Sequence, residues 1–127
     1  MNYLVDTHVL IWHIEGNKKL SKKIISILEN SQNNLFVSNA TLWEIAIKAS
    51  IGKLSLSIPL TKFKTFLSGN NFELLEYDYA CLEELIGLPF HHNDPFDRMM
   101  IAQAIVKNLS VISDDEKFRH YPIKLVL

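Results

Sequence analysis

The chain has 127 residues, 48% of them hydrophobic, a formal net charge of −1 and a single cysteine. This length predicts one domain, residues 1–127, and the lone Cys81 excludes an intramolecular disulfide and favours a reducing compartment. The near-neutral charge indicates no polyanionic partner but does not exclude one, because a local basic rim suffices. Without a signal segment or an apolar run of membrane-spanning length, we expect a cytoplasmic protein with no membrane contact.

Short apolar runs alternate with helical patterns along the chain. Strands are predicted at residues 3–5, 35–38, 72–77, 109–112 and 123–126, with a further short extended piece at 54–58. Helices are predicted at residues 8–15, 20–28, 42–49, 59–69, 79–86 and 94–107, with a short last helix at 114–118. This alternation implies an α/β fold built from βαβ units, with a mostly parallel sheet of four to five short strands covered on both faces.

Acidic residues recur where the predicted strands and helices meet. These are Asp6 after the first strand, Glu44 in the third helix, Asp94 and Asp97 at the start of the long helix, and Asp114, Asp115 and Glu116 after the fourth strand. In a parallel sheet the strand-to-helix junctions share one edge, and ligands bind there. We therefore expect these carboxylates to form a common site.

Each acid also has an ordinary explanation at a helix start. Asp94 has the features of an N-cap, and both Thr41-x-x-Glu44 and Ser113-x-x-Glu116 have the pattern of a capping box. A cap contributes about 1 kcal/mol, whereas two carboxylates about 4 Å apart near a surface repel by about 4 kcal/mol. A cluster of several acids therefore requires a cation, and carboxylate oxygens suit Mg²⁺ or Mn²⁺.

Other candidate residues give weaker indications. His91 and His92 lack the spacing and the cysteine partners of a zinc site, which favours a loop or RNA-facing role. Trp12 and Trp43 lie among apolar helix positions, where core packing is favoured over base stacking. The chain has no glycine-rich phosphate loop.

Four sequence blocks stand in a recognisable order. They are Leu4-Val5-Asp6-Thr7-His8, Leu42-Trp43-Glu44-Ile45-Ala46, His92-x-Asp94-Pro95-Phe96-Asp97-Arg98 and Ser113-x-Asp115-x-x-Phe118. In this order and spacing the blocks resemble the PIN domain, and more closely the VapC-type toxins of bacterial toxin–antitoxin pairs. The resemblance covers nearly the whole chain.

The resemblance implies a PIN-like three-layer α/β/α sandwich and a function. Its acidic quartet falls on Asp6, Glu44, Asp97 and Asp115, which would be both catalytic residues and ligands of Mg²⁺ or Mn²⁺. Asp114, next to the fourth position, leaves that assignment open. The implied activity is that of a metal-dependent endoribonuclease, which a cognate antitoxin inhibits by placing its tail in the acidic groove, and which commonly forms a homodimer.

Two further groups of side chains are candidates around the quartet. Thr7, Ser113 and Asp94 are expected to orient carboxylates or water, or to cap the helix that carries a ligand. Arg98, Lys48 and Lys53 are candidates for contacts with the RNA backbone.

Other functions remain open on the sequence alone. One is a catalytically inactive interaction module of the same fold, and another is a different Mg²⁺-dependent phosphohydrolase with an aspartyl nucleophile. The phosphohydrolase is expected to have a second acid two residues after Asp6, where this chain has His8. A phosphoacceptor signalling domain would need a lysine late in the sheet, and Lys124 is badly placed for it.

Overall fold

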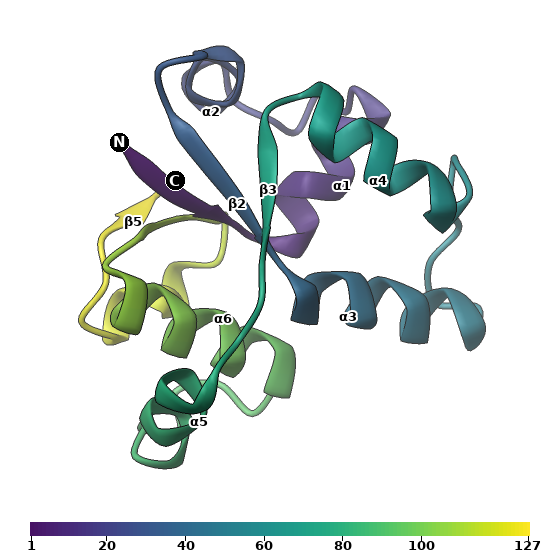
Figure 1. Ribbon diagram of the computed structural model, residues 1–127. Helices are drawn as coiled ribbons and strands as arrows, with labels where there is room; N and C mark the ends of the chain where they lie inside the picture. Colours follow the sequence, from purple (N-terminus) through teal and green to yellow (C-terminus); the bar gives the residue numbers. More distant parts are fainter.

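Five strands form a single parallel sheet in a computed structural model of the chain, which describes residues 1–127 (Figure 1). The strand order is β3-β2-β1-β4-β5. The strands are β1 (Asn2–Val5), β2 (Asn34–Ser38), β3 (Phe72–Leu75), β4 (Ser110–Ile112) and β5 (Leu125–Val126). The α/β fold with a central parallel sheet is confirmed, and β1 is its middle strand.

Six α-helices and one 3₁₀ helix complete the fold. They are α1 (Thr7–Glu15), α2 (Lys22–Glu29), α3 (Asn39–Ser50), α4 (Leu60–Gly69), α5 (Tyr79–Ile86), α6 (Pro95–Lys107) and η1 (Glu116–His120). Segment 54–58, predicted to be extended, pairs with no strand of the sheet, and its apolar side chains pack against the core instead. None of the helices combines the length and the hydropathy needed to cross a lipid bilayer.

The two faces of the sheet carry separate hydrophobic cores. Successive side chains of a strand point to opposite faces, and accordingly Tyr3 and Val5 join the core under α1, α2 and α4. Leu4 joins the core under α6 on the other face. Figure 1 shows α1 and α4 on one side of the sheet and α5 and α6 on the other, which confirms the three-layer α/β/α sandwich.

The strand register brings several junction residues to one edge. Leu4 pairs with Phe36 of β2 and with Val111 of β4. The backbone N–H of Asp6 donates to the carbonyl oxygen of Ile112 over 2.9 Å, which extends the β1–β4 pairing by one residue. Asp6 therefore lies level with Ser38, the last residue of β2, and with Ser113, the first residue after β4.

Candidate metal-binding active site

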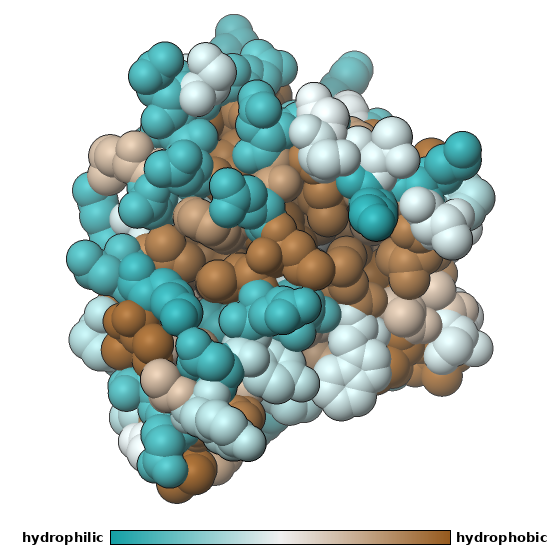
Figure 2. All heavy atoms as spheres, in the orientation of Figure 1, coloured by the Kyte–Doolittle hydropathy of each residue, from teal (hydrophilic) through white to brown (hydrophobic).

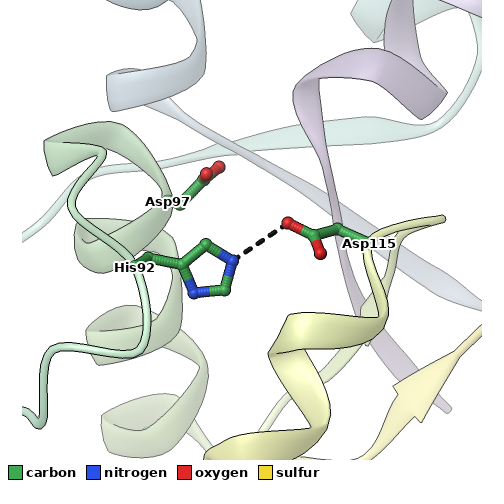
Figure 3. Close-up of side chains that lie close together, drawn as sticks. All are labelled: His92, Asp97 and Asp115. Atoms are coloured by element: carbon green, nitrogen blue, oxygen red, sulfur yellow. Dashed lines mark hydrogen bonds and ion pairs between the residues drawn. The ribbon is translucent and has the colours of Figure 1, made fainter.

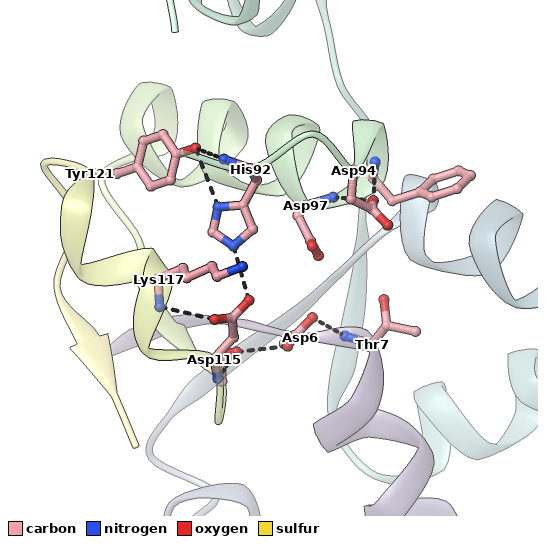
Figure 4. Close-up of polar contacts among 10 residues, drawn as sticks. Asp6, Thr7, His92, Asp94, Asp97, Asp115, Lys117 and Tyr121 are labelled. Carbon is pink, nitrogen blue, oxygen red and sulfur yellow. Dashed lines mark hydrogen bonds and ion pairs between the residues drawn. The ribbon is translucent and has the colours of Figure 1, made fainter. Parts of the chain in front are cut away.

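An acidic pocket of about 460 Å³ opens at this edge of the sheet. Its lining consists of eight polar or charged residues and one tryptophan, namely Asp6, His8, Trp12, Glu44, Lys48, Asp94, Asp97, Asp114 and Asp115. The structure thus brings together all four acids of the predicted quartet, from the end of β1, from α3, from α6 and from the turn after β4. Figure 4 shows three of them, Asp6, Asp97 and Asp115, with their side chains directed toward a common space.

Asp6 is a buried carboxylate held by two hydrogen bonds. It caps α1, and its Oδ1 accepts the backbone N–H of Thr7 over 2.7 Å. Its Oδ2 accepts the hydroxyl of Ser113, also over 2.7 Å. Burial nevertheless raises the pKa of Asp6 above its ordinary value, because desolvation outweighs the stabilisation that these bonds give the charged form.

Glu44 is equally buried and is also held at both oxygens. Its Oε1 accepts the hydroxyl of Thr7 over 2.7 Å, and its Oε2 accepts the ammonium of Lys48 over 2.6 Å. The capping box predicted at Thr41-x-x-Glu44 is wrong, because α3 begins earlier, at Asn39, and is capped by Ser38. Glu44 is therefore an interior helix residue whose side chain faces the pocket.

Asp97 is partly buried and lies near several other acids of the site. Asp94 caps α6, as predicted, by accepting the backbone N–H groups of Phe96 and Asp97 over 2.8 and 3.0 Å. The Asp97 carboxylate itself gains no stabilising hydrogen bond from the protein. Burial raises the pKa of Asp97 to about 8, and the neighbouring charges of Asp6, Asp94, Glu44 and Asp115 add to the effect.

Asp115 is fixed from three directions. Its Oδ2 lies 2.9 Å from Nε2 of His92 (Figure 3), and its Oδ1 accepts the backbone N–H of Lys117 over 2.9 Å. Its own N–H donates to the hydroxyl oxygen of Ser113. Burial opposes ionisation, but these bonds outweigh it and lower the pKa of Asp115. The capping box predicted at Ser113-x-x-Glu116 is wrong, because Asp115 is the residue that caps η1.

His92 belongs to the site, and the sequence did not indicate it. The side chain is 7% exposed, and its ring packs between Phe118 and Tyr121. The Tyr121 hydroxyl oxygen accepts the His92 backbone N–H over 2.9 Å and lies 3.3 Å from ring Nδ1. Ligand atoms of His92, Asp97 and Asp115 all lie within 4.8 Å of one another. His92 lies in the loop between α5 and α6, as predicted, but it is buried and therefore does not face RNA, whereas His91 is exposed.

The three candidates for RNA backbone contacts have different surroundings. Lys48 lines the pocket and pairs with Glu44. Lys53 is exposed and lies outside the pocket lining. The proposed phosphate contact of Arg98 is contradicted, because the residue is 6% exposed and its guanidinium donates to the carbonyl oxygens of Pro89 and Leu88 over 2.9 and 3.2 Å.

The donor set fits a hard divalent cation. The pocket presents the carboxylate oxygens of six acids, and Lys48 is the only lysine or arginine that lines it. A raised pKa at Asp97 shows that negative charge there is not compensated by the protein. Mg²⁺ and Mn²⁺ favour such oxygen ligands, and the ring nitrogen of His92 is a donor better suited to Mn²⁺ than to Mg²⁺.

Solved structures with the same fold include chains of VapBC complexes. The chain is similar to a chain of VapBC2 from Rickettsia felis bound to a promoter DNA fragment, with TM-score 0.70, 19% identity and coverage of 99% and 98% of the two chains. It is also similar to a chain of DNA-bound VapBC from Salmonella typhimurium, with TM-score 0.68, 21% identity and coverage of 99% and 97%. A third similar chain belongs to FitAcB from Neisseria gonorrhoeae, with TM-score 0.67, 15% identity and coverage of 98% and 96%.

Sequence comparison gives the family directly. No curated protein matches the chain. The family model described as the PIN domain matches residues 3–124, which include every acid of the pocket. The chain therefore belongs to the PIN-domain family, whose members are generally nucleases that depend on divalent metal ions.

Proposed function

We propose that this protein is a VapC-type toxin, a Mg²⁺- or Mn²⁺-dependent endoribonuclease that hydrolyses phosphodiester bonds of RNA. The observation that carries the proposal is the convergence of Asp6, Glu44, Asp97 and Asp115 on one pocket. The raised pKa of Asp97 supports the proposal. Burial and the neighbouring acids destabilise the ionised form of this carboxyl group, and a nearby cation would stabilise it.

In this proposal the four acids hold the metal. Asp6, Glu44 and Asp97 bind it directly or through water, and Asp115 completes or orients the ligand set. When bound, the ion lowers the pKa of a water molecule and neutralises charge that develops on the scissile phosphate. The proposal gives Asp97 a further task, since its carboxyl group must lose its proton before it serves as a ligand.

Hydroxyl groups position these carboxylates. Ser113 donates to Asp6 and accepts from the backbone N–H of Asp115, and Thr7 donates to Glu44. Such outer contacts fix the direction of each ligand oxygen. Lys48 neutralises Glu44 in the metal-free protein, and we propose that it moves to the RNA backbone when the metal takes its place.

We propose a cognate antitoxin as the protein partner. The similar chains from Rickettsia felis and Salmonella typhimurium come from structures named as VapBC. The acidic pocket suits a basic side chain of such a partner, and an apolar groove of about 490 Å³ offers a second surface. Six apolar residues line this groove, Leu42, Leu60, Phe63, Leu67, Phe72 and Leu74. Figure 2 shows apolar side chains gathered across the middle of this face, as at many protein-binding sites.

A homodimer is proposed from a different surface. The exposed fractions of Trp43, Tyr79 and Phe90 are 61%, 89% and 76%, which is unusual for aromatic side chains. Trp43 and Tyr77 also line a small apolar pocket with residues of α5 and α6. Sedimentation of the purified protein over a concentration series tests this assembly.

The rival functions are less well supported by the site. An inactive interaction module has no need for buried carboxylates without a balancing charge, yet the pocket retains them. An aspartyl phosphatase is disfavoured because the residue two positions after Asp6 is His8, an exposed side chain.

The test is cleavage of single-stranded RNA by purified protein. We expect cleavage with Mg²⁺ or Mn²⁺, none with EDTA, and none with Asp6→Asn or Asp97→Asn protein purified in the same way. Circular dichroism checks that both variants are folded. Cleavage by Asp97→Asn protein at the parent rate would contradict the role of Asp97. In a second test the parent is expressed in a host lacking the antitoxin, and RNA ends are sequenced. Absence of new RNA ends would contradict the proposed function.

A further inference from the structure

One wall of the acidic pocket is aromatic. Trp12 is the only hydrophobic residue among those that line it. His8, which is exposed, lines the same pocket and precedes Trp12 by four residues on α1. Residues four apart lie on one face of a helix, and the two rings have their centroids 6.1 Å apart. α1 thus directs an indole and an imidazole to the site that also holds Asp6.

Core packing accounts for only part of the Trp12 side chain. The apolar residues Val9 and Leu10 of the same helix are 2% and 0% exposed. Trp12 is half-buried, packing against that core while also lining the pocket. A tryptophan with an apolar body against the core and an accessible edge beside a polar site is suited to bind a ligand with a flat face.

Trp12 also contacts a basic segment. The ammonium of Lys19 lies over its ring, 5.5 Å from the centroid. Residues 18–23 contain four exposed lysines, Lys18, Lys19, Lys22 and Lys23. The indole therefore adjoins both the pocket whose carboxylates are proposed to hold the metal and Lys19, whose ammonium suits a phosphate group. Aromatic and basic side chains in this combination bind single-stranded nucleic acid.

We infer that Trp12 is a stacking site for one base of single-stranded RNA, next to the scissile phosphate, and that Lys19 pairs with a phosphate beside that base. The inference rests on the proposed function and adds a specific subsite to it. Stacking is tolerant of sequence because every base has a π-face, so the subsite positions the strand without selecting a base.

The second tryptophan is a matched control. Trp43 is 61% exposed, packs edge-to-face on Phe96 with centroids 5.4 Å apart, and does not line the acidic pocket. Because the chain has two tryptophans, Trp43→Phe leaves Trp12 as the sole source of tryptophan fluorescence.

Binding is measured apart from cleavage. Trp43→Phe is combined with Asp97→Asn, which prevents turnover in the proposed mechanism. Fluorescence of Trp12 is followed while single-stranded RNA is added, and anisotropy of end-labelled RNA reports binding independently. We expect quenching with ordinary RNA and little quenching with a strand of the same length that carries abasic sites at its centre.

Two substitutions at position 12 separate stacking from packing. Trp12→Phe keeps an aromatic face, whereas Trp12→Leu keeps apolar packing without one. We expect Trp12→Leu to weaken RNA binding about 5- to 150-fold, the effect of losing one stacked base, and Trp12→Phe to lose much less. In the cleavage-competent protein Trp12→Leu should raise KM more than it lowers kcat.

The outcomes distinguish this inference from the proposed function. Saturable RNA binding with unchanged Trp12 fluorescence, or equal affinities for Trp12→Leu and Trp12→Phe, would overturn the stacking site and leave the nuclease proposal standing. Failure of every variant and of the parent to bind RNA would overturn both.

Discussion

The hydroxyl of Ser113 donates to Oδ2 of Asp6 over 2.7 Å, joining residues 107 positions apart. The hydroxyl oxygen of Ser113 also accepts the backbone N–H of Asp115 over 3.0 Å. One side chain therefore sets the positions of two carboxylates, because Asp6 directly follows β1 and Ser113 directly follows β4, the neighbouring strand.

Ser113→Ala removes both bonds and leaves a buried Asp6 oxygen without its donor. We expect the affinity for Mn²⁺ to fall about 10- to 100-fold, as for other residues that orient metal ligands. Ser113→Thr keeps the hydroxyl and should retain affinity. Calorimetric titration with Mn²⁺ makes the measurement, and equal affinities for the alanine and threonine variants would contradict this role.

Asp97→Asn should stabilise the metal-free protein at high pH. The pKa of Asp97 is about 8 in the folded chain and near 3.8 without the fold. Between these values the folded state holds a proton that the unfolded state has lost, so the parent loses stability as pH rises from 4 to 8. The Asp97→Asn variant does not lose this stability. At pH 9 we expect its free energy of unfolding to exceed that of the parent by roughly 1–3 kcal/mol, after allowance for solvent screening.

Urea unfolding in EDTA at pH 5, 7 and 9 measures that difference. Asp114→Asn is the control, since Asp114 lines the pocket but is exposed. With Mn²⁺ in excess the order should reverse, because only the parent gains the free energy of tight metal binding. A difference between parent and Asp97→Asn that does not change with pH would count against the raised pKa.

His92 and His91 form a natural pair for substitution. His92→Ala removes the partner that lowers the pKa of Asp115 and contacts its Oδ2. We expect weaker Mn²⁺ binding by about 10-fold or more, together with a rise in the pKa of Asp115. His91→Ala should have little effect, because His91 is exposed. NMR titration of the Asp115 carboxyl carbon reports the pKa, and an Asp115 pKa in His92→Ala as low as in the parent would refute the positioning role.

Lys48 is predicted to compete with the metal for Glu44. Lys48→Met removes the ammonium 2.6 Å from Glu44 Oε2 and leaves that buried carboxylate with its bond from Thr7 alone. The metal-free variant should therefore unfold at lower urea concentration, and it should bind Mn²⁺ more tightly than the parent. Lys53→Met is the matched control because Lys53 is exposed and lies outside the pocket. Unchanged Mn²⁺ affinity in Lys48→Met would contradict the competition.

The layers and the acid positions could be predicted from sequence for a physical reason. Alternating short strands and helices fix a parallel sheet, and such a sheet gathers its junctions at one edge. Asp6 and Asp115, which come after β1 and β4, follow directly from this rule. Asp94 was also predictable as a cap, because N-capping depends on residues within one turn.

Contacts between distant residues account for what the sequence did not reveal. The side chain of His92 is positioned by its contacts with Tyr121, 29 residues later, and with Asp115, 23 residues later. Arg98 was expected at the surface, but the loop before α6 folds over it and supplies carbonyl acceptors. Ser113 and Thr41 matched capping patterns, yet tertiary hydrogen bonds to Asp6 and Thr7 engage their hydroxyls. No local pattern encodes these partners.

The proposed nuclease function depends most on the binding of a divalent ion among the four carboxylates. Titration of the metal-free protein with Mn²⁺ near pH 7, in buffers of different ionisation enthalpy, measures binding and proton release together. We predict saturable binding with a net release of protons, since Asp97 must ionise to become a ligand, and loss of both signals in Asp6→Asn and Asp97→Asn. Equal Mn²⁺ binding by the parent and both variants, with no proton released, would contradict the central claim.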